Sequence, residues 1–60
     1  MKTVRIYTRR MALFIKRKGL NEVDIVPDEK KPNFSNWIFK DTKELRDAMA
    51  EYSAIFYVRD

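Results

Sequence analysis

The side chains that most often carry out catalysis are scarce in this sequence. Its 60 residues include no histidine and no cysteine, which removes the usual general base, the commonest metal ligand and any thiol nucleophile. Ser35 and Ser53 therefore lack a histidine to activate them. Gly19 is the single glycine, so a glycine-rich phosphate loop is absent. We expect no catalytic residues, no cofactor and no small-molecule substrate, and hence a protein that is not an enzyme.

Carboxylates are the remaining residues that could do chemistry. Asp24, Asp28 and Glu29 could approach one another around the end of a strand. Converging oxygens of this kind hold Mg²⁺ together with substrate phosphates. Acids at a strand edge and in a turn are more often solvated or paired with nearby cations, here Lys30 and Lys31. We therefore predict no metal site.

Positive charge is concentrated in the first third of the chain. Residues 1–20 hold seven of the thirteen lysines and arginines and no acid, whereas residues 21–60 hold all nine acids. A cationic end attracts polyanions or acidic protein surfaces, although a net charge of +4 also keeps a small domain soluble. The residues that we predict to contact a partner are Arg5, Tyr7, Arg9, Arg10, Leu13, Lys16, Arg17, Lys30 and Lys31.

Three segments that would position these residues have the pattern of strands. Residues 2–7 alternate polar and apolar side chains, which is typical of a half-buried strand. Residues 20–27 repeat the pattern and end at Pro27, which cannot donate a hydrogen bond to a sheet. Residues 34–40 are rich in aromatic side chains, which favour strands. The polar segment 28–33 predicts a turn between the last two strands.

Most of the early basic residues lie on one predicted helix. Thr8 is a favoured N-cap and Gly19 a favoured terminator, so the spacing predicts a helix over residues 9–18. Successive residues turn by about 100°, and the apolar side therefore holds Met11, Phe14 and Ile15, with Ala12 at its margin. The opposite arc holds Arg9, Arg10, Leu13, Lys16 and Arg17. Arginines in the first turn are disfavoured by the helix dipole, which points to an external partner.

The last third of the chain predicts a second helix. Asp41, with Glu44 three residues later, resembles a capping box. Apolar residues then recur at helical spacing from Leu45 onwards, and we expect the helix to end near residue 56. Residues 54–58 are also aromatic and β-branched enough to form a fourth strand, so that alternative stays open.

These elements predict one α+β domain over residues 1–60. A right-handed crossover through the first helix makes the first two strands parallel, and a short turn makes the second and third antiparallel. We expect a two-layer β-α-β-β-α fold, with a three-stranded mixed sheet and two helices on one face. The single tryptophan is expected in the core. The predicted core is Val4, Ile6, Met11, Phe14, Ile15, Val23, Ile25, Trp37, Phe39, Leu45, Met49 and Tyr52.

Neither a membrane nor a secreted location fits the sequence. The longest apolar run is residues 11–15, far short of the roughly 20 residues that a bilayer span needs. We see no signal peptide, because residues 1–3 lead directly into an alternating pattern without an apolar stretch. We expect a cytoplasmic protein without membrane contact.

Two runs of residues carry a resemblance to a known family. The first run is Ile6-Tyr7, Ala12, Phe14-Ile15, Lys18-Gly19 and Val23-Asp24-Ile25-Val26. The second run is Lys30-Lys31-Pro32-Asn33, Trp37-Ile38-Phe39-Lys40-Asp41-Thr42, Glu44-Leu45 and Tyr52. In this order they resemble small uncharacterised proteins encoded by prophages and mobile elements, chiefly of Gram-positive bacteria. The Lys31-Pro32-Asn33 turn departs from the Asn-Pro turn of that family. The resemblance spans residues 4–56 and implies a bacterial host cytoplasm, with no assigned activity or site.

Two binding functions remain. The leading hypothesis is an accessory protein that binds a macromolecular partner, with a protein slightly favoured, through the basic helix face and an open sheet face. Tyr7, Val26 and Ile38 would form a modest apolar patch on that sheet face. A homodimer through the same face or a strand edge would compensate for the small core.

The alternative hypothesis is a small DNA-binding module. Phosphates would be contacted by Arg9, Arg10, Lys16, Arg17 and the Lys30-Lys31 turn. The sheet could also enter a major groove, where Arg5, Asn36 and Lys40 would read bases. Glu22 and Asp24 share that predicted face and would repel phosphates.

Overall fold

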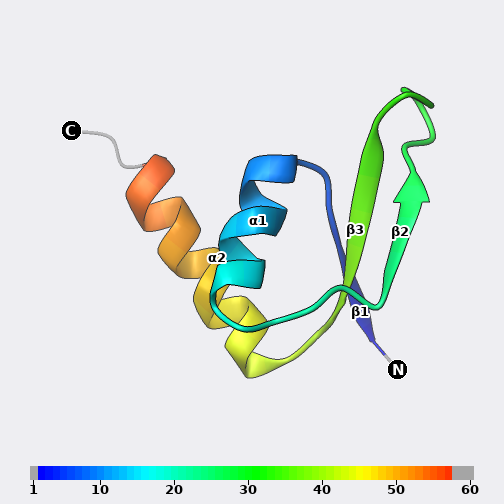
Figure 1. Cartoon of the computed structure of the whole chain (residues 1–60). Helices are drawn as coiled ribbons and strands as arrows, with labels where there is room; N and C mark the ends of the chain where they lie inside the picture. The colour runs from blue at the N-terminus through cyan, green and yellow to red at the C-terminus, as the bar shows by residue number, and fades with distance from the viewer. Residues whose placement is uncertain (1, 58–60) are drawn as a thin grey trace.

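The computed structural model describes residues 2–57. Its elements are β1 (Thr3–Ile6), α1 (Arg9–Arg17), β2 (Asp24–Pro27), β3 (Ser35–Lys40) and α2 (Lys43–Phe56). The strands form one three-stranded sheet, and both helices lie on the same side of it (Figure 1). The predicted α+β class, the order of elements and the placement of the helices are confirmed.

The sheet has the order β1-β3-β2, and both of its ladders are antiparallel. Val4 lies opposite Phe39 in one ladder, and Ile25 lies opposite Trp37 in the other. β1 and β2 therefore run in the same direction, as the crossover predicts. They are not neighbours, however, because β3 returns into the space between them. The prediction of a mixed sheet is therefore wrong, since every paired strand is antiparallel.

The core forms where α1 and α2 meet the inner face of the sheet. The fully buried apolar residues are Ile6, Ala12, Ile15, Phe39, Leu45, Ala48 and Tyr52. Ala12 was expected only at the margin, but its side chain has no exposed surface. A small side chain at this position lets α1 approach the sheet closely, so Ala12 belongs to the core.

Two predicted core residues, Val23 and Ile25, are each 52% exposed. The register places Ile25 on the same face as Trp37, so its predicted orientation is right. β2 is nevertheless an edge strand, and α1 packs on β1 and β3 instead. The apolar face of β2 therefore extends beyond the helices and stays partly in solvent.

The remaining predicted core residues are partly buried around this centre. Val4, Met11, Trp37 and Met49 pack against the buried cluster. Phe14 instead meets α2, where its ring lies edge-on to Tyr52 with the centroids 5.5 Å apart. The aromatic contact joins the two helices away from the sheet.

Side-chain caps fix the ends of both helices. Thr8 Oγ1 accepts a hydrogen bond from Met11 N at 3.4 Å, and Gly19 adopts φ +93° after α1, so both predicted signals are confirmed. The cap of α2 is Thr42, whose Oγ1 accepts from Leu45 N at 3.1 Å. The prediction of Asp41 as the cap is wrong, because Thr42 is the residue that directly precedes the helix.

α2 continues to Phe56, as predicted, so residues 54–56 are helical rather than a fourth strand. The end of that alternative strand, Val58, lies outside the described residues. Within residues 2–57, neither helix combines the length and the apolar content that crossing a bilayer requires.

Candidate functional site

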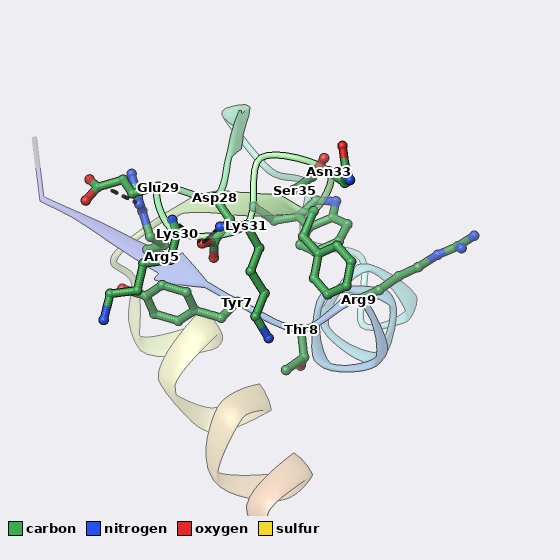
Figure 2. Close-up of a pocket in the computed structure, with 12 residues that line it drawn as sticks. Arg5, Tyr7, Thr8, Arg9, Asp28, Glu29, Lys30, Lys31, Asn33 and Ser35 are labelled. Carbon is green, nitrogen blue, oxygen red and sulfur yellow. Dashed lines mark hydrogen bonds and ion pairs between the residues drawn. The ribbon is translucent and has the colours of Figure 1, made fainter.

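A hollow of about 1140 Å³ lies between the β2–β3 loop and the beginning of α1 (Figure 2). We call it the loop hollow. Its wall combines cations, acids and aromatic rings from residues 5–9 and residues 28–37. The lining residues are Arg5, Tyr7, Thr8, Arg9, Asp28, Glu29, Lys30, Lys31, Asn33, Phe34, Ser35 and Trp37.

Asp28 gives the β2–β3 loop its shape. One carboxylate oxygen, Oδ1, accepts hydrogen bonds from the backbone N–H groups of Lys30 at 2.8 Å and Lys31 at 3.0 Å. This is the local turn that an aspartate side chain favours. The backbone closes the loop further, since Asp28 N donates to Phe34 O and Phe34 N donates to Lys31 O, both at 2.8 Å. The backbone N–H groups of Lys30 and Lys31, which donate to the Asp28 carboxylate, are the main cause of the lowered pKa of this carboxyl.

Asn36 connects this loop to β1. Its Nδ2 donates to Asp28 Oδ2 at 3.2 Å, and its Oδ1 accepts from Arg5 Nη1 at 3.4 Å. Arg5 Nη1 lies 3.8 Å from Glu29 Oε1 as well. Asn36 is completely buried, so it cannot reach a base in a major groove. The hypothesis of a sheet that reads bases therefore loses one of its three predicted readers.

The cations and rings on the wall of the hollow remain accessible. Lys30 and Lys31 are exposed on the loop, and Lys31 Nζ lies 5.6 Å from the centroid of the Phe34 ring. Phe34 is 58% exposed and Tyr7 is 65% exposed. In Figure 2 the Lys31 side chain extends from the loop towards the start of α1, whereas Arg9 points outwards. A ligand in the hollow would meet both charge and aromatic surface.

The structure brings together five of the nine predicted partner-binding residues at this hollow, namely Arg5, Tyr7, Arg9, Lys30 and Lys31. The other four lie on α1. Arg10 places its guanidinium 5.4 Å from the Phe56 ring centroid, and Lys16 Nζ lies 3.0 Å from Glu22 Oε1. Lys16 lowers the pKa of the Glu22 carboxyl. Leu13 is 44% exposed and Arg17 is exposed, so these two lie on the outer surface of α1.

Phe34 was not predicted as a site residue, and Asn36 was predicted for a different role. Phe34 was predicted in a strand, but it belongs to the loop. An aromatic residue directly after a polar turn was the pattern that could have indicated an exposed binding residue. Asn36 was assigned to an open face, but it is the buried link between loop and sheet. An asparagine inside a strand is unfavourable, and this was the available signal for a special role.

The fold and site define a small α+β domain with an open hollow that is lined by cations and aromatic rings. Among residues 2–57, no group of three or more acids gathers closely enough to hold a metal ion. The chain belongs to a family described as a domain of unknown function, DUF5659, whose model matches residues 1–59. No curated protein and no solved structure matches the chain.

Proposed function

We propose that this domain is a non-enzymatic binding module and that its partner is a nucleic acid contacted at the phosphates. The observation that carries the proposal is the loop hollow, where Arg5, Arg9, Lys30 and Lys31 meet three aromatic side chains. Lysine and arginine contacts to phosphates supply most of the affinity of sequence-independent nucleic-acid binding.

The charge balance of the hollow supports an anionic partner. Asp28 turns its carboxylate towards backbone N–H groups of its own loop, and Glu29 lies beside Arg5. Within residues 2–57, Arg9, Lys30 and Lys31 form no ion pair with a carboxylate. Their positive charge is therefore available to a ligand. Asp28 is held by hydrogen bonds within its loop, and the exposed Glu29 offsets part of the positive charge of Arg5, so four cations still outnumber two acids on the wall.

An acidic protein surface is the second candidate. It is supported by Leu13, which is 44% exposed and follows Arg9 by one helical turn on the outside of α1. The apolar patch expected on the open sheet face supports it less, because Val26 and Ile38 are only partly exposed. For this reason we propose a nucleic acid as the partner rather than the protein that the sequence slightly favours.

The test is the salt dependence of binding to a fluorescently labelled oligonucleotide. We expect affinity to fall steeply with salt, and the double variant Lys30→Gln/Lys31→Gln to flatten the log–log slope by about 0.7–0.9 for each lost phosphate contact. The matched control is Lys40→Gln/Lys43→Gln, which removes two exposed lysines that do not line the hollow. Absence of binding at about 50 mM salt would contradict the proposal, and so would equal effects of the two double variants.

A homodimer stays a prediction. Two features of β2 oppose pairing through its free edge. Ile25 N–H already donates to Asp24 Oδ1 at 2.8 Å, and Pro27 has no N–H to donate. A dimer would therefore use the sheet face or the free edge of β1, and sedimentation at several protein concentrations measures whether one forms.

We also propose, from the sequence resemblance alone, that the protein is an accessory protein of a phage or mobile element and works in the cytoplasm of a bacterial host. Cell fractionation tests the location. Recovery of the protein in the membrane or culture-medium fraction would contradict it.

A further inference from the structure

We infer that the loop hollow takes a single nucleic-acid strand rather than a duplex, with bases stacked on Tyr7 and Phe34 and phosphates held by Lys30 and Lys31. This inference rests on the nucleic-acid function proposed above and specifies its ligand. It starts from the aromatic side chains, which phosphate binding alone does not require.

The first argument is the exposure of the rings. Tyr7 and Phe34 are 65% and 58% exposed, although both are large and could have been buried in a domain with so small a core. In a duplex the bases are stacked on one another, so their faces are not available to exposed rings. Single strands present free base faces, and proteins that bind them combine a cationic groove with aromatic stacking platforms.

The second argument is the position of charge beside the rings. Lys31 Nζ lies 5.6 Å from the Phe34 centroid, so one side chain places a cation next to a stacking surface. Arg5 and Lys30 line the same hollow. A nucleotide presents a flat base and a phosphate only a few bonds apart, and this combination fits a wall on which rings and cations lie side by side.

The third argument is size. The hollow has a volume of about 1140 Å³ and is open to solvent (Figure 2). Pockets for small molecules range from about 300 to 1,000 Å³ and bury most of their ligand. An open hollow of this size fits a stretch of chain that passes through it better than a small ligand. The hydrogen bonds that Asp28 accepts from the backbone N–H groups of Lys30 and Lys31 fix the loop backbone before binding, which reduces the ordering cost.

The experiment uses an unstructured oligothymidine of about 20 nucleotides and a duplex of the same length, both longer than the roughly 4–16 nucleotides that one single-strand-binding domain covers. Trp37 is the only tryptophan and lines the hollow, so its fluorescence reports binding at this place. We expect the single strand to bind more tightly than the duplex and to quench Trp37.

The matched variants are Tyr7→Leu and Tyr57→Leu. Both remove an exposed tyrosine ring, 65% and 61% exposed, but only Tyr7 lines the hollow. We expect Tyr7→Leu to lower single-strand affinity by about 5- to 140-fold, the loss that corresponds to one stacked base, and to leave the salt slope unchanged. Tyr57→Leu should bind like the unmodified protein. Phe34→Leu provides a second test of stacking at an independent position.

The outcomes separate the two proposals. Equal affinity for duplex and single strand, or normal single-strand binding by both Tyr7→Leu and Phe34→Leu, overturns the single-strand inference and leaves the phosphate-binding function standing. Absence of binding to either nucleic acid overturns both proposals. Quenching of Trp37 by polyglutamate, with neither nucleic acid bound, also overturns both and assigns the hollow to an acidic protein.

Discussion

Replacing Asn36 with alanine tests the link between the sheet and the loop hollow. The substitution removes two hydrogen bonds of a completely buried side chain, at 3.2 Å to the Asp28 carboxylate and at 3.4 Å from Arg5. A neutral hydrogen bond contributes about 1 kcal/mol and one to a charged group about 1.5–3 kcal/mol. Both distances are long, so we expect Asn36→Ala to lower the free energy of unfolding by about 2 kcal/mol. For a domain of this size the melting temperature should fall by roughly 10 °C.

The measurement is thermal unfolding followed by circular dichroism, with Asn33→Ala as the matched control. Asn33 is an exposed asparagine in the same loop, and its replacement should change stability by less than about 0.5 kcal/mol. A second variant, Asn36→Asp, places a carboxylate against Asp28 and should gain stability as the pH is lowered. Equal melting temperatures for Asn36→Ala and Asn33→Ala would refute the reasoning. Asn36→Ala should also weaken oligonucleotide binding without changing its salt slope, because the loop cations remain.

Three further predictions concern the elements around the site. Thr42→Ala removes the N-cap of α2 and should lower the free energy of unfolding by about 1 kcal/mol in denaturant, and an unchanged free energy of unfolding would contradict Thr42 as the cap. Gly19→Ala forces a Cβ onto a backbone with φ +93°, and because that Cβ meets no atom within 4 Å, the loss should be limited to about 1–2 kcal/mol of backbone strain. The folded-state pKa values of Glu22, Asp28 and Asp41 lie below the ordinary values of 4.5 for glutamate and 3.8 for aspartate. Their stabilisation is therefore present above about pH 5 and declines as the pH falls through the lowered values. A pH titration of melting temperature should show a shallower acid decline for Asp28→Asn, and an unchanged decline would contradict this assignment.

Local patterns predicted the elements well because each depends on near neighbours. Thr8 and Gly19 mark the two ends of α1. The alternation around Ile6 correctly predicted which side chains of β1 face the core. The insertion of β3 between β1 and β2 depends on which distant segments pair. The spacing of apolar residues along the chain does not predict that pairing. The exposure of Ile25 follows from the same cause, since its face was predicted correctly but its edge position was not.

The site was predicted less completely than the fold. Charge is visible in any sequence, so Lys30 and Lys31 were predicted to contact a partner, and both are exposed. Their contact with a partner stays a prediction. The hollow itself requires the loop and the start of α1 to lie together, and this arises only after β1 and β3 have paired. Asn36 illustrates the limit, because the same polar side chain is solvated on an open strand and buried once Asp28 folds over it.

The structure also divides the cations of residues 2–57 into those that have a partner within the domain and those that have none. Lys16 and Lys18 pair with Glu22 at 3.0 Å and Glu51 at 2.7 Å, so part of the basic first third is accounted for within the domain. The two arginines that the helix dipole disfavours divide in the same way. Arg10 lies over the Phe56 ring and gains a cation–π contact. Arg9 gains no ion pair within residues 2–57 and lines the hollow instead.

A contact within the domain therefore accounts for the unfavourable position of Arg10 in the first turn of α1. No ion pair within residues 2–57 accounts for the position of Arg9. Arg9 and Lys30, which have no such internal contact within residues 2–57, both line the loop hollow, whereas Arg17, Lys40 and Lys43 also have none and lie outside it. A charge placed at a local cost is expected where a partner supplies the missing interaction. The total charge of the chain is compatible with solubility alone, whereas the cations on the wall of the hollow that are unpaired within residues 2–57 are the observation that supports the proposed anionic ligand.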